Sequence, residues 1–169
     1  MQANPITTKS IKKATSYLKR LAVQSPIFLC IGTMSVLADS IGPQVGTLLN
    51  ANMSHPLTVY GATSNAITAQ NLQQAYAFVK SMHPNSTIVV VDSAVGTPDQ
   101  IGKVQIAPFG VQAGKATGKS FQPMGDISIV GIVANKNMKD FYTPTRRQQN
   151  TVDTLCRLIS NSILQSLQV

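Results

Sequence analysis

Thr87-Ile88-Val89-Val90-Val91 is the stretch that decides the fold class, and Asp92-Ser93-Ala94-Val95-Gly96 follows it directly. Every residue of the first stretch is β-branched and none is charged, which indicates a strand buried on both faces of a sheet. Other apolar runs predict strands over residues 27–31, 57–60, 104–109 and 127–133. Such strands need cover on both faces, so helices are expected between them in the chain.

Apolar residues at helical spacing predict these helices, over about residues 9–22, 43–52, 68–82 and 149–167. Pro43 stands where a proline fits the first position of a helix. The alternation of strands and helices predicts an α/β fold, a three-layer α/β/α sandwich with a largely parallel or mixed central sheet. We expect a single domain over residues 1–169, in which residues 1–25 form a basic amphipathic N-terminal helix.

Charge is the unusual feature of the composition. Of 169 residues, 14 are Lys or Arg and 6 are acidic, and all six acids are aspartates. The formal net charge of +8 favours an acidic partner. Aromatic residues make up only 5% and we find no nucleic-acid-binding motif, so nucleic acid is not expected as the partner.

The remaining bulk features predict a soluble, cytoplasmic protein. No apolar run reaches the roughly 18 residues that a membrane span needs, and the start of the chain has no signal core. Cys30 and Cys156 lie far apart in apolar surroundings, as is typical of buried, reduced thiols. His55 and His83 have no neighbour at metal-ligand spacing, so the sequence predicts neither a metal site nor a cofactor.

Two aspartates follow predicted strands, where sites in α/β folds are found. Asp39 lies in the loop after the 27–31 strand, and Asp92 comes directly after residues 87–91. If the two strands are neighbours, both carboxylates point into one crevice, where one can hold a proton while the other activates water. Alternatively, Asp39 caps the following helix and Asp92 binds a neighbouring backbone N–H, and position alone does not decide between these readings.

The loop over residues 110–125 is rich in Gly and Lys, and residues 113–120 match a relaxed phosphate-loop pattern. A phosphate loop needs a helix directly after it, but Pro123 and Gly125 precede a strand that begins at Ile127. The match is therefore interpreted as coincidental. We expect Lys115 and Lys119 instead to overhang the crevice and favour an acidic substrate.

Several of these stretches also resemble a known family, the YyaC-type sporulation proteins. The resemblance covers about residues 27–165 and rests on residues 30–33, 39–46, 59–61, 91–96 and 118–131. The family is similar to the germination (spore) protease and, more distantly, to the hydrogenase-maturation endopeptidases. The resemblance implies a phosphorylase/hydrolase-like fold, with Asp39 and Asp92 as the pair of an unusual aspartic peptidase. In the hydrogenase-maturation relatives the matching acids bind nickel together with a histidine, and this chain has no histidine after His83.

The leading hypothesis is therefore a germination-protease-like hydrolase in which Asp39 and Asp92 activate water against a peptide bond. Backbone N–H groups near Gly42 or Gly96 are expected to stabilise the oxyanion, and the partner is a peptide or protein substrate. A homo-oligomer is left open. The predicted substrate-binding residues are Gly32, Thr33, Gly42, Gly96, Lys115, Lys119 and Asp126.

The alternative hypothesis is a non-catalytic binding protein of the same fold. It would use its basic surface for an acidic protein or a nucleic-acid partner. The basic residues concerned are Lys12, Lys13, Lys19 and Arg20.

Overall fold

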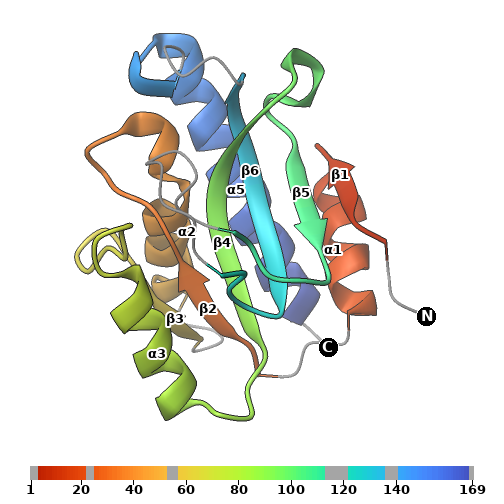
Figure 1. Ribbon diagram of the computed structural model, residues 1–169. Helices are drawn as coiled ribbons and strands as arrows, with labels where there is room; N and C mark the ends of the chain where they lie inside the picture. The colour runs from red at the N-terminus through yellow and green to blue at the C-terminus, as the bar shows by residue number, and fades with distance from the viewer. Residues whose placement is uncertain (1–3, 22–24, 53–56, 113–121, 136–140, 168–169) are drawn as a thin grey trace.

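The computed structural model of the protein describes residues 4–21, 25–52, 57–112, 122–135 and 141–167. Within these residues, six strands form one sheet in the order β1-β5-β6-β4-β2-β3 (Figure 1). The strands are β1 (Ile6–Thr8), β2 (Ile27–Cys30), β3 (Thr58–Tyr60), β4 (Ile88–Gly96), β5 (Val104–Ala107) and β6 (Ile127–Asn135). The helices are α1 (Ile11–Arg20), α2 (Ile41–Asn50), α3 (Leu72–Met82) and α5 (Arg146–Leu167), with short 3-10 turns η1 (Leu37–Asp39) and η2 (Pro98–Gln100).

The sheet is mixed, as predicted. Strands β3, β2, β4 and β6 run parallel to one another, whereas β5 is antiparallel to β6 and β1 is antiparallel to β5. The chain passes from β2 to β3 on one side of β2, and then returns to form β4 on its other side. The order of the strands therefore reverses between β2 and β4, and α/β sheets bind ligands beyond the carboxyl ends of strands at such a point.

Helices cover both faces of the sheet, so the three-layer α/β/α architecture is confirmed. Alternate residues of β4 face opposite layers: Val89 and Val91 pack with α2 and α5, and Ile88 and Val90 pack with residues of α3. In Figure 1, α5 passes behind β4 and β6, while α3 lies in front of the sheet. β4 is thus the central strand of the protein, with apolar side chains buried on both of its faces.

Several elements differ from the predictions. The expected N-terminal helix over residues 1–25 is wrong in extent, because α1 covers only Ile11–Arg20 and strand β1 precedes it. β1 is a short edge strand that the apolar pattern does not reveal, and its register is set only by pairing with β5. Helix α2 begins at Ile41, so Pro43 is its third residue and not its first. A proline is tolerated there because the N–H groups of the first turn of a helix have no intrahelical partner. β4 does not end before Asp92 but continues to Gly96, because β6 remains paired beside it up to Asn135.

The described helices include none that combines the length and the apolar content needed to cross a membrane.

Candidate active site

The candidate site lies where β2 ends beside a longer β4. The pairing of the two strands ends at Cys30 and Val91, and the last bond runs from the Ile31 N–H to the Val91 carbonyl oxygen over 2.8 Å. Backbone groups of successive strand residues point alternately to the two neighbouring strands. The backbone N–H and carbonyl groups of Ser93 therefore point to the same side of β4 as those of Val91, the side on which β2 has already ended. Within the described pairing, no residue of β2 lies opposite Ser93.

Asp92 lies inside β4, and its side chain is only 8% exposed. Its Oδ1 accepts a hydrogen bond from the backbone N–H of Ser93 over 2.7 Å. The alternative prediction, that Asp92 binds a neighbouring backbone N–H, is thus correct for one of its two oxygens. The other oxygen, Oδ2, accepts no hydrogen bond from the described residues.

Asp39 reaches the same point from the loop between β2 and α2. Its Oδ1 accepts a hydrogen bond from the Ser93 hydroxyl over 3.3 Å, and its Oδ2 accepts one from the Thr33 N–H over 3.2 Å. The N-cap of α2 is Ser40, and no side chain caps that helix. The predicted alternative that Asp39 caps α2 is therefore wrong, because its carboxylate is turned toward β4.

Burial gives the two carboxyl groups different protonation states. Burial and, to a smaller extent, the charge of Asp39 raise the pKa of Asp92 to about 8, against the effect of the Ser93 N–H. Burial also raises the pKa of Asp39, to about 6, while hydrogen bonds from Ser93 and Thr33 oppose this rise. At neutral pH the pair therefore carries one proton, held by Asp92, and one negative charge, on Asp39.

Three glycines allow the chain to pack closely around the end of β2. A Cβ at Gly32 would overlap the carbonyl oxygen of Asp39, and one at Gly42 would overlap that of Ile31. Gly61 has φ +92° and lies against the carbonyl oxygen of Cys30. Gly32 and Gly42, which were predicted to bind substrate, thus have a clear packing role beside the two aspartates.

Thr33 is half-buried, and its N–H is bonded to both the carboxylate and the carbonyl oxygen of Asp39. The structure therefore places Thr33 at the site as a residue that holds Asp39. Its backbone donor is already engaged within the protein.

Other predicted substrate-binding residues do not join the pair. Gly96 lies at the end of β4, four residues past Asp92, which is roughly 13 Å along a strand. Asp126 lies at the amino end of β6, where its Oδ2 accepts a 2.8 Å hydrogen bond from the Ile88 N–H. We therefore leave Gly96 and Asp126 out of the site. Lys115 and Lys119 fall outside the described residues.

Ser93 is the residue that sequence reasoning missed. It contacts both aspartates, yet the predicted strand ended before it, so it was not considered as a strand residue. The available signal was its spacing of two from Val91, which gives both residues the same orientation in a strand.

Metal-ligating residues do not cluster in the described part of the chain: no group of three or more His, Cys, Asp or Glu side chains lies together there. Cys30 and Cys156 are free and buried, as expected. Burial raises the pKa of both thiols, that of Cys156 to about 12, so both stay protonated near neutral pH.

We expect stability to fall as pH rises. Between the ordinary value of 3.8 and the raised value of about 8, folded Asp92 keeps a proton that the unfolded chain releases. The free energy of unfolding should thus decrease by up to about 1.4 kcal/mol per pH unit for each such group. Asp92→Asn should remove most of this decline above pH 6, as measured by denaturant unfolding at several pH values. Asp99→Asn, which alters an exposed aspartate, should leave the decline in place; an unchanged decline in Asp92→Asn would contradict the assignment.

Comparisons with known proteins agree with this description of the fold. The protein named "Uncharacterized protein YyaC" from Bacillus subtilis (strain 168) is 26% identical over 149 residues, which are 88% of this chain and 73% of that protein. The crystal structure of a [NiFe] hydrogenase maturation protease, HycI from Thermococcus kodakarensis KOD1, has a similar fold. Its TM-score is 0.52 at 16% identity, over 88% of this chain and 99% of that one. Residues 2–162 match the family described as "Protein of unknown function (DUF1256)", and the chain therefore belongs to the DUF1256 family.

Proposed function

We propose that this protein is a peptidase-like hydrolase in which Asp39 and Asp92 act together on a water molecule. The observation that carries the proposal is the meeting of the two carboxyl groups at Ser93, each held by a hydrogen bond from that residue. A fold similar to that of a hydrogenase maturation protease supports it. The germination-protease type of mechanism, predicted from the family resemblance, is part of the proposal.

The protonation states assign a role to each aspartate. Ionised Asp39 takes a proton from water as the water oxygen attacks the peptide carbonyl carbon, and Asp92 gives its proton to the carbonyl oxygen. The C–N bond then breaks. Asp39 passes its proton to the leaving nitrogen, and Asp92 regains a proton from the hydroxyl group of the intermediate. Each group ends in its starting state, so the pair is ready for another cycle.

This mechanism requires no backbone donor for the oxyanion, because Asp92 neutralises the developing charge. Of the two glycines predicted to supply such donors, Gly96 lies too far along β4, and a role for the N–H near Gly42 stays a prediction. The proposed substrate is a peptide or protein. Its acidic character, inferred from Lys115 and Lys119, is likewise part of the proposal.

The first test is the loss of peptide cleavage on amide substitution. The full chain is incubated with a peptide library made by digesting a whole proteome, and new peptide ends are identified by mass spectrometry. We expect Asp39→Asn and Asp92→Asn each to lower the cleavage rate by about 10²- to 10⁴-fold, the usual contribution of general acid–base catalysis. Asp153→Asn is the matched control, because Asp153 is exposed on α5 and accepts a hydrogen bond from Gln149. Full activity in both site variants would exclude the mechanism.

The second test is the dependence of cleavage on pH. Activity requires Asp39 ionised and Asp92 protonated, so kcat/KM should pass through a maximum between pH values of about 6 and about 8. Below this window Asp39 gains a proton and loses its capacity as a base. Above it Asp92 loses the proton that the carbonyl oxygen needs. A rate that rises steadily up to pH 10 would contradict these roles.

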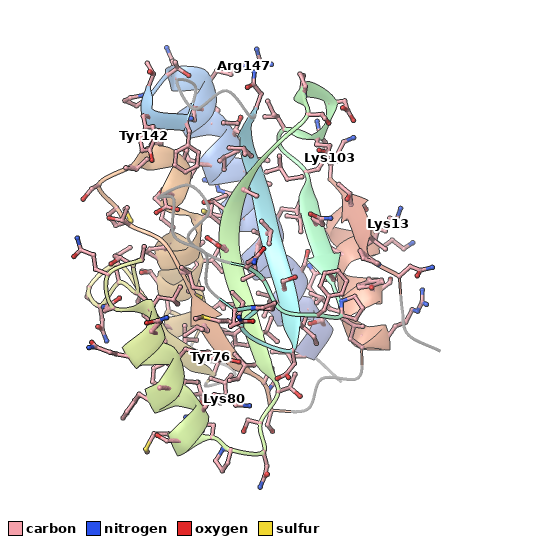
Figure 2. The ribbon with its side chains drawn as sticks, viewed as in Figure 1. Lys13, Tyr76, Lys80, Lys103, Tyr142 and Arg147 are labelled. Carbon is pink, nitrogen blue, oxygen red and sulfur yellow. The ribbon has the colours of Figure 1, made fainter. Side chains whose placement is uncertain are left out.

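One observation favours the second candidate function, binding without catalysis. Lys12 and Lys13 are exposed on α1, which buries its opposite face against α5, and Lys13 lies on the outer side of the molecule in Figure 2. The only ion pair among the described residues is the one between Lys103 and Asp99. Among the described residues, Lys12 and Lys13 make no ion pair.

Binding through this face should depend on salt and not on the aspartates. With heparin and poly-glutamate as probes, we expect Lys12→Glu combined with Lys13→Glu to weaken binding at least tenfold at 50 mM salt, and high salt to weaken binding of the unaltered protein. Asp39→Asn should bind normally. Binding that ignores both salt and the two lysines would exclude this function.

A further inference from the structure

Ser93 is the only residue of the described chain that bonds to both aspartates. Its hydroxyl donates to Oδ1 of Asp39 over 3.3 Å, and its backbone N–H donates to Oδ1 of Asp92 over 2.7 Å. The two donors belong to one residue of a paired strand, so the distance between them is set by covalent geometry. Ser93 therefore places the two carboxyl groups relative to each other.

The two hydrogen bonds are not equivalent. Asp92 receives one backbone bond, and any residue except proline at position 93 could supply it. Asp39 receives the hydroxyl bond, which depends on the side chain, in addition to the Thr33 N–H. A donated hydrogen bond stabilises the charged form of a carboxyl group. The side chain of Ser93 thus acts selectively in favour of an ionised Asp39.

The difference in burial adds to this selection. Asp92 lies within the strand and is the more buried of the two, so its charged form is the more strongly disfavoured.

We propose that Ser93 is a positioning residue that directs the single proton of the pair to Asp92 by donating its hydroxyl hydrogen to Asp39. This inference rests on the proposed function for its catalytic consequence. The placement of the proton can be measured whether or not the protein cleaves peptides.

The described elements around the pair carry few other ionisable groups. β2 carries Cys30 and α5 carries Cys156; both are buried thiols. η1, α2 and β6 have no ionisable side chain apart from Asp39 itself. The charged side chains of α5 are exposed; they are Arg146, Arg147, Asp153 and Arg157.

The composition makes a direct measurement practical. The chain has six aspartates and no glutamate, so labelling aspartate with ¹³C gives six side-chain carboxyl signals. Spectra of Asp39→Asn and Asp92→Asn assign the two signals of interest in the full chain. We expect the midpoint of the Asp39 signal to rise by about one pH unit in Ser93→Ala, because the variant loses a hydrogen bond to a charged group.

Three further variants distinguish the hydroxyl from the packing of the side chain. Ser93→Thr keeps the hydroxyl and should restore the original midpoint, and Ser93→Cys, a weaker donor, should shift it in the same direction as alanine. Ser128→Ala alters a buried serine of β6 that bonds to neither carboxylate, and it should leave both midpoints unchanged. If Ser93→Ala fails to fold, the cysteine variant carries the test.

The acid limb of the kcat/KM profile should move up with the Asp39 midpoint, by about one pH unit, while the alkaline limb stays. An unchanged Asp39 midpoint in both Ser93→Ala and Ser93→Cys would overturn the proposal, as would an equal shift in Ser128→Ala. A shifted midpoint in a protein that cleaves no peptide would support the role of Ser93 and overturn the proposed function. The two failures are therefore distinguishable.

Discussion

The burial of a carboxyl group within the central strand is the constraint on which the rest of the site depends. Moving an unpaired charge out of water costs several kcal/mol, so a buried carboxyl group either binds donors or keeps its proton. Asp92 does both, with the Ser93 N–H on one oxygen and a pKa raised to about 8. The donor is available only because β2 ends at Cys30 while β4 continues to Gly96. The unequal lengths of two adjacent strands thus create the site.

Much of this arrangement follows from local patterns in the sequence. The β-branched stretch at 87–91 predicted the central strand, and the rule for carboxyl ends of strands predicted that Asp39 and Asp92 lie in one crevice. The two aspartates meet at Ser93 because β2 and β4 are neighbours, with Cys30 opposite Val91. Which strands are neighbours follows from the overall topology. The sequence pattern does not reveal it, so the meeting of the two aspartates could be predicted only on the condition that the two strands pair.

The sequence was less informative where tertiary pairing overrides local preference. Asp92 and Ser93 resemble the end of a strand, yet β6 holds them in β4, and the role of Ser93 was missed for that reason. Asp126 showed the opposite case. It has the residue type of a site and a position within a family motif, but its carboxylate binds the Ile88 N–H at the amino edge of the sheet. Residue type alone does not show whether an aspartate lies at the amino ends or at the carboxyl ends of the parallel strands.

The glycines around the end of β2 affect how the protein tolerates change. At Gly32, Gly42 and Gly61 an added Cβ would meet a backbone carbonyl oxygen, which cannot rotate away as the end of a flexible side chain can. In a survey of all single substitutions, these positions would be as intolerant as the two aspartates. The two kinds of intolerance differ in nature. A site aspartate can accept asparagine and still fold, whereas each glycine position rejects even alanine on steric grounds. Folding and activity must therefore be measured separately, in order to distinguish residues that take part in the reaction from residues that only hold the site in shape.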